Sequence, residues 1–325
     1  MKKILTALVT AALVLFSAGC EKIIEFNGEV TEPQLTISSY AEAGNPLTVF
    51  VASSVFFLSD QKYGQAFTDG LDTLRGSVRC FVNGATEPHR LKLFPEGDVC
   101  SLCYQATDYE PAPGDHIRLE AEFPGFEPVW AETDVPLMPR FEVLSAKWNP
   151  VTLDDLTDLF IDDDTVYYEL EMTLAVTDDG SYDKFYFLQP VAYREEEWLE
   201  EGYWFSLSYT SNDIIFRELS GGNAMQSLPD ESSRNYFSDA LIKGQRHTFT
   251  ITTDFVLDKE NILYIGLLAA TVNESVYWYD MSYHQVDSGL GGIFAEGTTL
   301  YSNVHGGYGF FGASAPVLLD VEVGK

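Results

Sequence analysis

Cys20 is the residue of this chain whose chemistry is easiest to infer from its surroundings. Residues 4–16 form an apolar stretch, residues 17–19 are small, and the charged Glu21 and Lys22 follow the cysteine at once. Small side chains give a peptidase access to the backbone, and a thiol is a nucleophile that lipid-transferring chemistry can use. We therefore predict cleavage before Cys20 and acylation of its sulfur.

The segment before Cys20 has the features of a signal peptide, with basic residues at Lys2 and Lys3 and an apolar part too short to span a bilayer. It resembles the lipobox of bacterial lipoproteins, although Ser17 stands where leucine is usual. We predict a signal peptide over 1–19 and a tether over 20–29, with acyl chains that hold the protein on the outer membrane. The alternative is an ordinary secretory peptide in which Cys20 is incidental.

Glu21 bears on which side of the outer membrane the protein occupies. An acidic residue just after the lipidated cysteine resembles the surface-export signal of Bacteroidota lipoproteins. A single glutamate matches that signal only in part, so the cell surface and the periplasmic face both stay open.

The other three cysteines are Cys80, Cys100 and Cys103, and the last two form a CxxC motif. A structural zinc site needs four ligands, and the sequence has no second CxxC motif. The stretch VCSLCYQ predicts a strand, on which residues three apart point to opposite faces. The sequence leaves two alternatives: a disulfide between Cys80 and one of the other two, or buried free thiols.

An acidic run beside aromatic residues raises the question of glycosidase chemistry, which needs two carboxyl groups held across a sugar. The acids are Glu195, Glu196, Glu197, Glu200 and Glu201. They are neighbours in one segment, whereas catalytic acids come from separate rigid strands. We interpret the segment as a solvated loop over packed aromatics, with ligand contact through Trp198, Tyr203 and Trp204 as the alternative, and we predict no enzymatic activity.

Metal and phosphate sites are weakly indicated. Two aspartate clusters suit either calcium or turn chemistry: 162–164, and Asp178, Asp179 with Asp183. The five histidines lack the spacing of a zinc hydrolase. The glycine-rich HGGYGFFG lacks the lysine of a phosphate-binding loop and predicts tight hairpin packing instead. We expect neither a metal nor a cofactor.

Composition limits the partners. The formal net charge is −31, which repels nucleic acid and anionic lipid headgroups, so we predict no nucleic-acid binding. The chain is 46% hydrophobic and 14% aromatic, which is typical of a folded protein and not of a disordered one. Its 325 residues suit a leader followed by two domains.

Alternation of apolar and polar residues, with turn signals every eight to twelve positions, predicts a mainly β protein. We expect two antiparallel β-sandwich domains, an immunoglobulin-like or transthyretin-like one over 30–139 and a larger β-rich one over 140–325. One short helix is expected in the second domain, capped by Asn273 or Ser275. Its apolar stripe is Val276, Tyr279, Tyr283 and Val286.

Several segments together resemble a Bacteroidota lipoprotein family, domain of unknown function 4249. They are CEKIIEF, PQLTISSY, PAPGDHIRLEAEFPGF, FSDALIKGQ and LYSNVHGGYGFFGASAP. The resemblance implies a lipid-anchored outer-membrane protein commonly encoded beside TonB-dependent transporters, and it brings no catalytic residues. We expect a non-enzymatic accessory to nutrient or chelate uptake that contacts a transporter. A structural envelope protein and a surface hydrolase are the alternatives.

Overall fold

The computed structural model confirms a mainly β protein with several antiparallel sheets and one α-helix in its described part. It describes residues 32–55, 67–68, 70–94, 101–151, 167–195, 202–216, 235–254, 259–287 and 300–324. Of these, the residues from Pro33 onward belong to one unit. Within the described ranges, no helix is both long enough and apolar enough to cross a membrane.

Eight strands precede residue 140 among the residues that the structure describes. They are β1 (Leu35–Glu42), β2 (Thr48–Ser53), β3 (Ser77–Val82), β4 (His89–Arg90), β5 (Lys92–Phe94), β6 (Leu102–Gln105), β7 (His116–Glu122) and β8 (Val129–Asp134). The period-two alternation is visible in β1, where Leu35 and Ile37 are buried and the residues between them are more accessible.

Nine strands and one α-helix follow in the described ranges after residue 140. The strands are β9 (Phe141–Val151), β10 (Tyr167–Thr177), β11 (Phe185–Arg194), β12 (Tyr203–Ser206), β13 (Tyr209–Thr210), β14 (Tyr236–Ser238), β15 (Arg246–Thr253), β16 (Ile262–Val272) and β17 (Tyr308–Asp320). The helix is α2 (Glu274–Asp287), and two 3-10 turns are η3 (Ile214–Phe216) and η5 (Lys259–Asn261).

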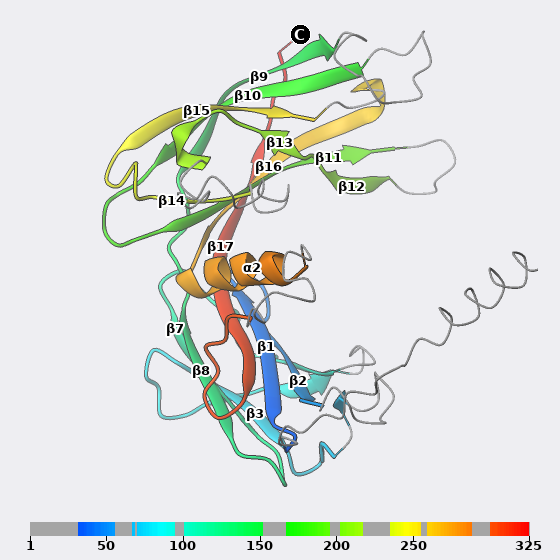
Figure 1. The fold of residues 1–325 in the computed structure, drawn as a ribbon, viewed down its shortest axis with the longest axis vertical. Coiled ribbons are helices and arrows are strands. Elements are labelled where there is room, and N and C mark those ends of the chain that lie inside the picture. Colours follow the sequence, from blue (N-terminus) through cyan, green and yellow to red (C-terminus); the bar gives the residue numbers. More distant parts are fainter. Residues whose placement is uncertain are drawn as a thin grey trace, which may run out of the picture. The chain divides into compact units, whose positions relative to one another are not determined.

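The strands form one nine-stranded sheet and two four-stranded sheets. The large sheet has the order β12-β11-β16-β17-β1-β2-β6-β5, with β14 also paired to β11, and the small sheets are β13-β15-β10-β9 and β4-β3-β7-β8. Strand β17, drawn in red in Figure 1, joins the two halves of the large sheet. Its first half pairs in parallel with β1, and its second half pairs antiparallel with β16.

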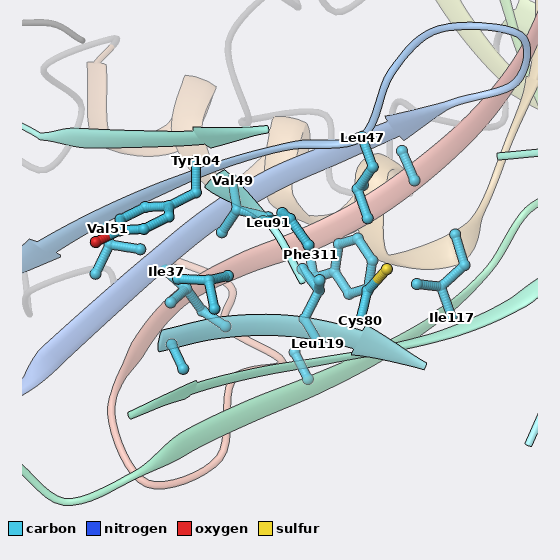
Figure 2. Packing of buried hydrophobic residues seen from close by; sticks show 14 of the residues in the cluster. Ile37, Leu47, Val49, Val51, Cys80, Leu91, Tyr104, Ile117, Leu119 and Phe311 are labelled. Atoms are coloured by element: carbon cyan, nitrogen blue, oxygen red, sulfur yellow. The ribbon is translucent and has the colours of Figure 1, made fainter. Parts of the chain in front are cut away.

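Each four-stranded sheet shares a hydrophobic core with one half of the large sheet. In the first core, Ile37 and Val49 of the large sheet pack with Cys80 and Leu119 of the sheet β4-β3-β7-β8 (Figure 2). Phe311 of β17 is fully buried in the same core. The second core contains Leu170, Met172 and Phe249 from β10 and β15, with Leu188 and Leu267 from β11 and β16.

The first core therefore draws on both ends of the chain. The division into domains 30–139 and 140–325 stays a prediction. In the structure, Phe311 and Ala313 of β17 pack among core residues that come from 35–135. A long-range parallel pairing of this kind carries no local sequence signal, because it depends on which strands meet after the chain has folded.

The glycines of HGGYGFFG allow β17 and the segment before it to approach β1 closely. A Cβ atom on Gly309, whose φ is +122°, would lie 1.9 Å from the carbonyl oxygen of Ile37. A Cβ on Gly307 would lie 2.2 Å from the carbonyl oxygen of Leu35. Only glycine fits such contacts. The packing is tight, but the predicted hairpin is wrong, because these residues of β17 pair in parallel with β1.

Two asparagines bond the edge of β17 that β16 does not reach. The Asn303 side chain accepts from the Phe311 amide and donates to its carbonyl, both at 2.8 Å. The backbone N–H of Asn273 donates to the Ala313 carbonyl at 3.0 Å, and the side-chain oxygen of Asn273 accepts from the backbone N–H of Ala313 at 3.2 Å. These bonds satisfy backbone groups that would otherwise be buried unpaired.

Asn273 also caps helix α2, as predicted. Its Oδ1 accepts from the backbone N–H of Val276 at 3.1 Å, three residues on, which is the geometry of an N-cap. The helix packs through Val276 and Tyr277, which are buried, and through Tyr279, whose ring stacks on Phe310 at 4.3 Å.

The predicted apolar stripe of the helix is partly wrong. Tyr283, which was predicted to face the core, is 48% exposed. Tyr277, which was not predicted to, is buried, and its ring stacks on Phe185 of β11 at 4.3 Å between centroids. The side chain of Val286 lies outside the described residues.

Candidate functional site

Three aromatic rings lie side by side across neighbouring strands of the large sheet. Trp204 of β12 is directly opposite Tyr193 of β11, which is directly opposite Tyr264 of β16. The ring of Trp204 lies 5.3 Å from that of Tyr193 and 5.2 Å from that of Tyr264, measured between centroids. We call these three residues the aromatic row.

The pleat of the sheet directs the aromatic row away from the second core. Alternate residues of a strand point to opposite faces, and the neighbours Ala192 and Ile265 are buried on the core side. Trp204 is 54% exposed. The row therefore lies on the outer face of the sheet, where Trp204 offers ring surface to solvent.

Glycines leave room for the two tyrosine rings to pack against the backbone. A Cβ on Gly266 would lie 2.8 Å from Leu318 Cδ1 and 3.0 Å from Tyr264 Cε1, so these side chains close over the glycine. A Cβ on Gly202 would lie 2.5 Å from the hydroxyl oxygen of Tyr193. Rings that pack closely against the backbone and against one another form a pre-organised surface, which reduces the entropy cost of binding.

A carboxylate lies at the end of the row. The Tyr264 hydroxyl donates a hydrogen bond to Asp320 of β17, and this bond raises the pKa of the Tyr264 phenol. Tyr264 is therefore a neutral donor at physiological pH, and Asp320, which is exposed, keeps its second oxygen for another partner.

Of the three aromatic residues predicted to contact a ligand, the structure places only Trp204 in the row. Tyr203 is 38% exposed, but as the neighbour of Trp204 on one strand it points to the opposite face, where its ring lies 5.8 Å from Phe205. Trp198 and the acids 196, 197, 200 and 201 lie outside the described residues, and Glu195 is exposed.

The sequence analysis missed Tyr193, Tyr264 and Asp320. Each sits in a recognisable strand, but the residues are far apart along the chain and meet only through the register of β11, β16 and β17. A search for tyrosines flanked by apolar alternation would have proposed the first two without showing that they are neighbours.

Cys80 and Cys103 are free and buried. Cys80 lies in the first core, whereas Cys103 pairs with Phe50 on the face of the large sheet that points away from that core. A disulfide between these two is therefore wrong, because their side chains point into different environments. Burial raises the pKa of the Cys80 thiol to about 12, so it is unreactive at neutral pH. Cys100 and Cys20 lie outside the described residues, and predictions that involve them stay predictions.

The aspartates of the predicted calcium or turn site hold lysine ammonium groups. Lys184, which is 5% exposed, donates to Asp178 Oδ2 at 3.0 Å and also to Asp179. Asp183 pairs with Lys243 instead. A lysine ammonium thus occupies the position that a cation would take among Asp178 and Asp179, and the turn interpretation describes this cluster. Residues 162–164 lie outside the described residues.

Asp178 remains ionised although it is buried. Burial raises its pKa, but hydrogen bonds from the Gly244 amide at 2.6 Å, from Lys184 and from the Gly180 amide at 2.7 Å outweigh burial and leave the pKa below its usual value. The Tyr186 hydroxyl donates to the same carboxylate at 2.9 Å. The carboxylate is satisfied by donors on every side, which describes a structural ion pair and not a reactive acid.

The outer face of the sheet β4-β3-β7-β8 carries a network of ion pairs. Arg79 binds Glu120 and Glu122, and Arg118 binds Glu120 and Glu132. We call these five residues the charge ladder. Among the residues that the structure describes, no group of three or more His, Cys, Asp or Glu is arranged to hold a metal ion.

Comparison with known proteins identifies a family whose model matches most of the chain. The model of the family described as Domain of unknown function (DUF4249) matches residues 21–317. No curated protein matches the chain.

Proposed function

The chain belongs to the family described as Domain of unknown function (DUF4249), and from this premise we propose that it is a lipid-anchored, non-enzymatic protein of the outer membrane. In this proposal it assists a TonB-dependent transporter in the uptake of a nutrient or a metal chelate. The sequence before Cys20 supports the anchor, and the resemblance that the motifs carry supports the association with a transporter.

The aromatic row is the observation that carries the binding role. An exposed tryptophan backed by two tyrosines, with Leu318 at 49% exposure beside them, concentrates apolar surface on one face of a sheet. Contiguous apolar surface of this kind marks interaction sites on soluble domains. Aromatic rings with polar tips suit sugars, peptides and planar chelates, all of which are cargo of uptake systems.

Anchoring is the first part of the proposal to test. Intact mass spectrometry of the protein purified from its native membrane is expected to show a chain that begins at Cys20 and carries two or three fatty acyl chains. Protease treatment of whole cells then distinguishes the cell surface from the periplasmic face. A chain that begins elsewhere, or that carries no acyl group, would refute the anchor.

Association with a transporter is the second part. The tagged full-length protein, solubilised in mild detergent, is expected to co-purify with a TonB-dependent transporter encoded beside it, and deletion of the gene is expected to impair growth on one nutrient. Trp204→Ala is expected to weaken the association, and Trp278→Ala serves as the control, because Trp278 is an exposed tryptophan on helix α2, 46% accessible, outside the row. Unchanged growth on all defined nutrients together with an altered envelope would favour the structural role instead.

A further inference from the structure

The molecule contains an internal example of how it binds a cation on a sheet surface. The guanidinium of Arg118 lies 4.1 Å from the centre of the Trp130 ring. The same guanidinium donates to Glu132 at 2.8 Å, and Arg118 Nε donates to Glu120 at 2.9 Å. An aromatic ring and carboxylates on adjacent strands together make a site for a planar cation.

The aromatic row has the same components without the cation. Trp204 supplies a more exposed ring, Tyr193 and Tyr264 extend the aromatic surface, and Asp320 supplies the carboxylate. The register places the following residues around it on the same face: Gln189, Val191, Ser206, Gly266, Leu268 and Leu318. No lysine or arginine is among these described residues.

We propose that the aromatic row and Asp320 form a docking site for an extended, arginine-containing segment of a partner protein. The Tyr264 ring lies between Trp204 on β12 and Asp320 on β17, because its centre is 5.2 Å from that of Trp204 and its hydroxyl donates to Asp320. An arginine that stacks on Trp204 therefore leaves Asp320, beyond the Tyr264 ring, for a second basic side chain. Residues i and i+2 of an extended segment are about 7 Å apart and point to the same side, so successive basic side chains can take these two positions.

Such a segment lies across the strands with a basic side chain at every second position. Its arginines stack on Trp204 and on the tyrosines, and the last one meets Asp320. Arginine is preferred to lysine, because its planar guanidinium stacks on a ring and donates two parallel hydrogen bonds to a carboxylate. The net charge of −31 attracts a basic segment and repels an acidic one.

This inference rests on the proposed function only in assuming that the chain has a protein partner in the envelope. The two proposals fail separately. If the transporter co-purifies equally with wild type and with Trp204→Ala, the accessory role stands and the docking site is wrong. If no transporter co-purifies but the peptide described next binds the row, the docking site stands and the accessory role is wrong.

The test uses a fluorescently labelled peptide, Gly-Arg-Thr-Arg-Thr-Arg-Gly, titrated with the full-length protein in non-ionic detergent and followed by anisotropy. A second peptide carries citrulline in place of arginine, which keeps the shape and removes the charge. We expect the citrulline peptide to bind about tenfold more weakly than the arginine peptide. Raising the salt concentration should weaken the arginine peptide selectively.

Three variants locate the site. Trp204→Ala is expected to weaken binding of the arginine peptide about tenfold, and Asp320→Asn to weaken it about threefold. Trp278→Ala is expected to leave binding unchanged. Trp204→Phe, which keeps a ring, should retain most of the affinity, and an unchanged melting temperature shows that each variant is folded. Equal binding of the arginine and citrulline peptides, or unaltered binding by Trp204→Ala, would overturn the proposal.

Discussion

The two halves of the nine-stranded sheet support two cores of similar construction, yet the outer surfaces of the two halves of the molecule differ in how their polar and aromatic groups are paired. Beside the first core, the charge ladder on β3, β7 and β8 pairs each arginine with two carboxylates. Beside the second core, the aromatic row leaves Trp204 54% exposed. The first surface pairs its charges with one another, and the second presents apolar area that a partner can cover.

Two tryptophans show the same difference at the level of single residues. The Trp130 ring is covered on one face by Arg118 at 4.1 Å and stacks on His305 at 3.9 Å with an interplanar angle of 13°. Trp204 instead contacts two tyrosines at angles of 54° and 75°. Trp130 is therefore used within the fold, whereas Trp204 is the ring available for binding.

The largest expected effect comes from breaking the strand that the two halves share. Gly309→Ala places a Cβ against the Ile37 carbonyl at a φ of +122°, and we expect a loss of at least about 4 kcal/mol in the free energy of unfolding. Because β17 pairs with both β1 and β16, both cores should lose stability in one cooperative transition. Urea unfolding followed by tryptophan fluorescence measures this.

Gly44→Ala is the matched control for Gly309→Ala. Gly44 has a φ of +86° but nothing within 4 Å of a Cβ, so only backbone strain changes, and we expect a loss of about 1 kcal/mol. Equal losses in the two variants would show that close packing against β1 contributes little.

A smaller loss is expected from the buried ion pair of the second half. Lys184→Met leaves the Asp178 carboxylate buried without its counter-charge, and we expect a loss of about 3 kcal/mol in unfolding free energy. Lys243→Met removes an exposed partner of Asp183 and should leave unfolding unchanged within error. The charge ladder, which is more exposed than Lys184, should tolerate a single arginine-to-glutamine change better than the buried pair tolerates Lys184→Met.

How far the sequence predicts this molecule depends on whether the signal is local. The strands and the Asn273 cap follow from neighbouring residues, so they were predictable. The glycines of HGGYGFFG predicted close packing but not its partner, since they approach Leu35 and Ile37 of β1 and form no hairpin there. The pairing of β17 with β1 joins residues about 270 positions apart in the numbering, and no local pattern encodes it. The aromatic row has the same origin, since Tyr193 and Tyr264 meet Trp204 only through strand register.

Acid titration tests the same buried pair by another route. The folded-state pKa of Asp178 lies below its unfolded value of about 3.9, so its stabilisation is complete above that pH and is lost as the pH falls through the folded-state pKa. Wild type should therefore lose more stability than Asp178→Asn when the pH falls from 5 to 3. This loss of unfolding free energy on acidification should be smaller than the loss caused by Lys184→Met, because the backbone amides of Gly180 and Gly244 still donate to Asp178. Parallel pH profiles of the two proteins would contradict this assignment.

The smallest effects compare the two tryptophans directly, and they decide whether the difference between the two surfaces is real. Trp130→Ala removes a ring held between Arg118 and His305, and we expect a loss of about 1.5 kcal/mol in unfolding free energy. Trp204→Ala removes a ring that is mostly in solvent, so the loss should stay within about 0.5 kcal/mol, while the binding of the arginine peptide falls. If Trp204→Ala costs as much stability as Trp130→Ala, the aromatic row serves the fold as the charge ladder does. A near-zero cost combined with lost binding means that the exposed ring contributes to recognition and not to folding.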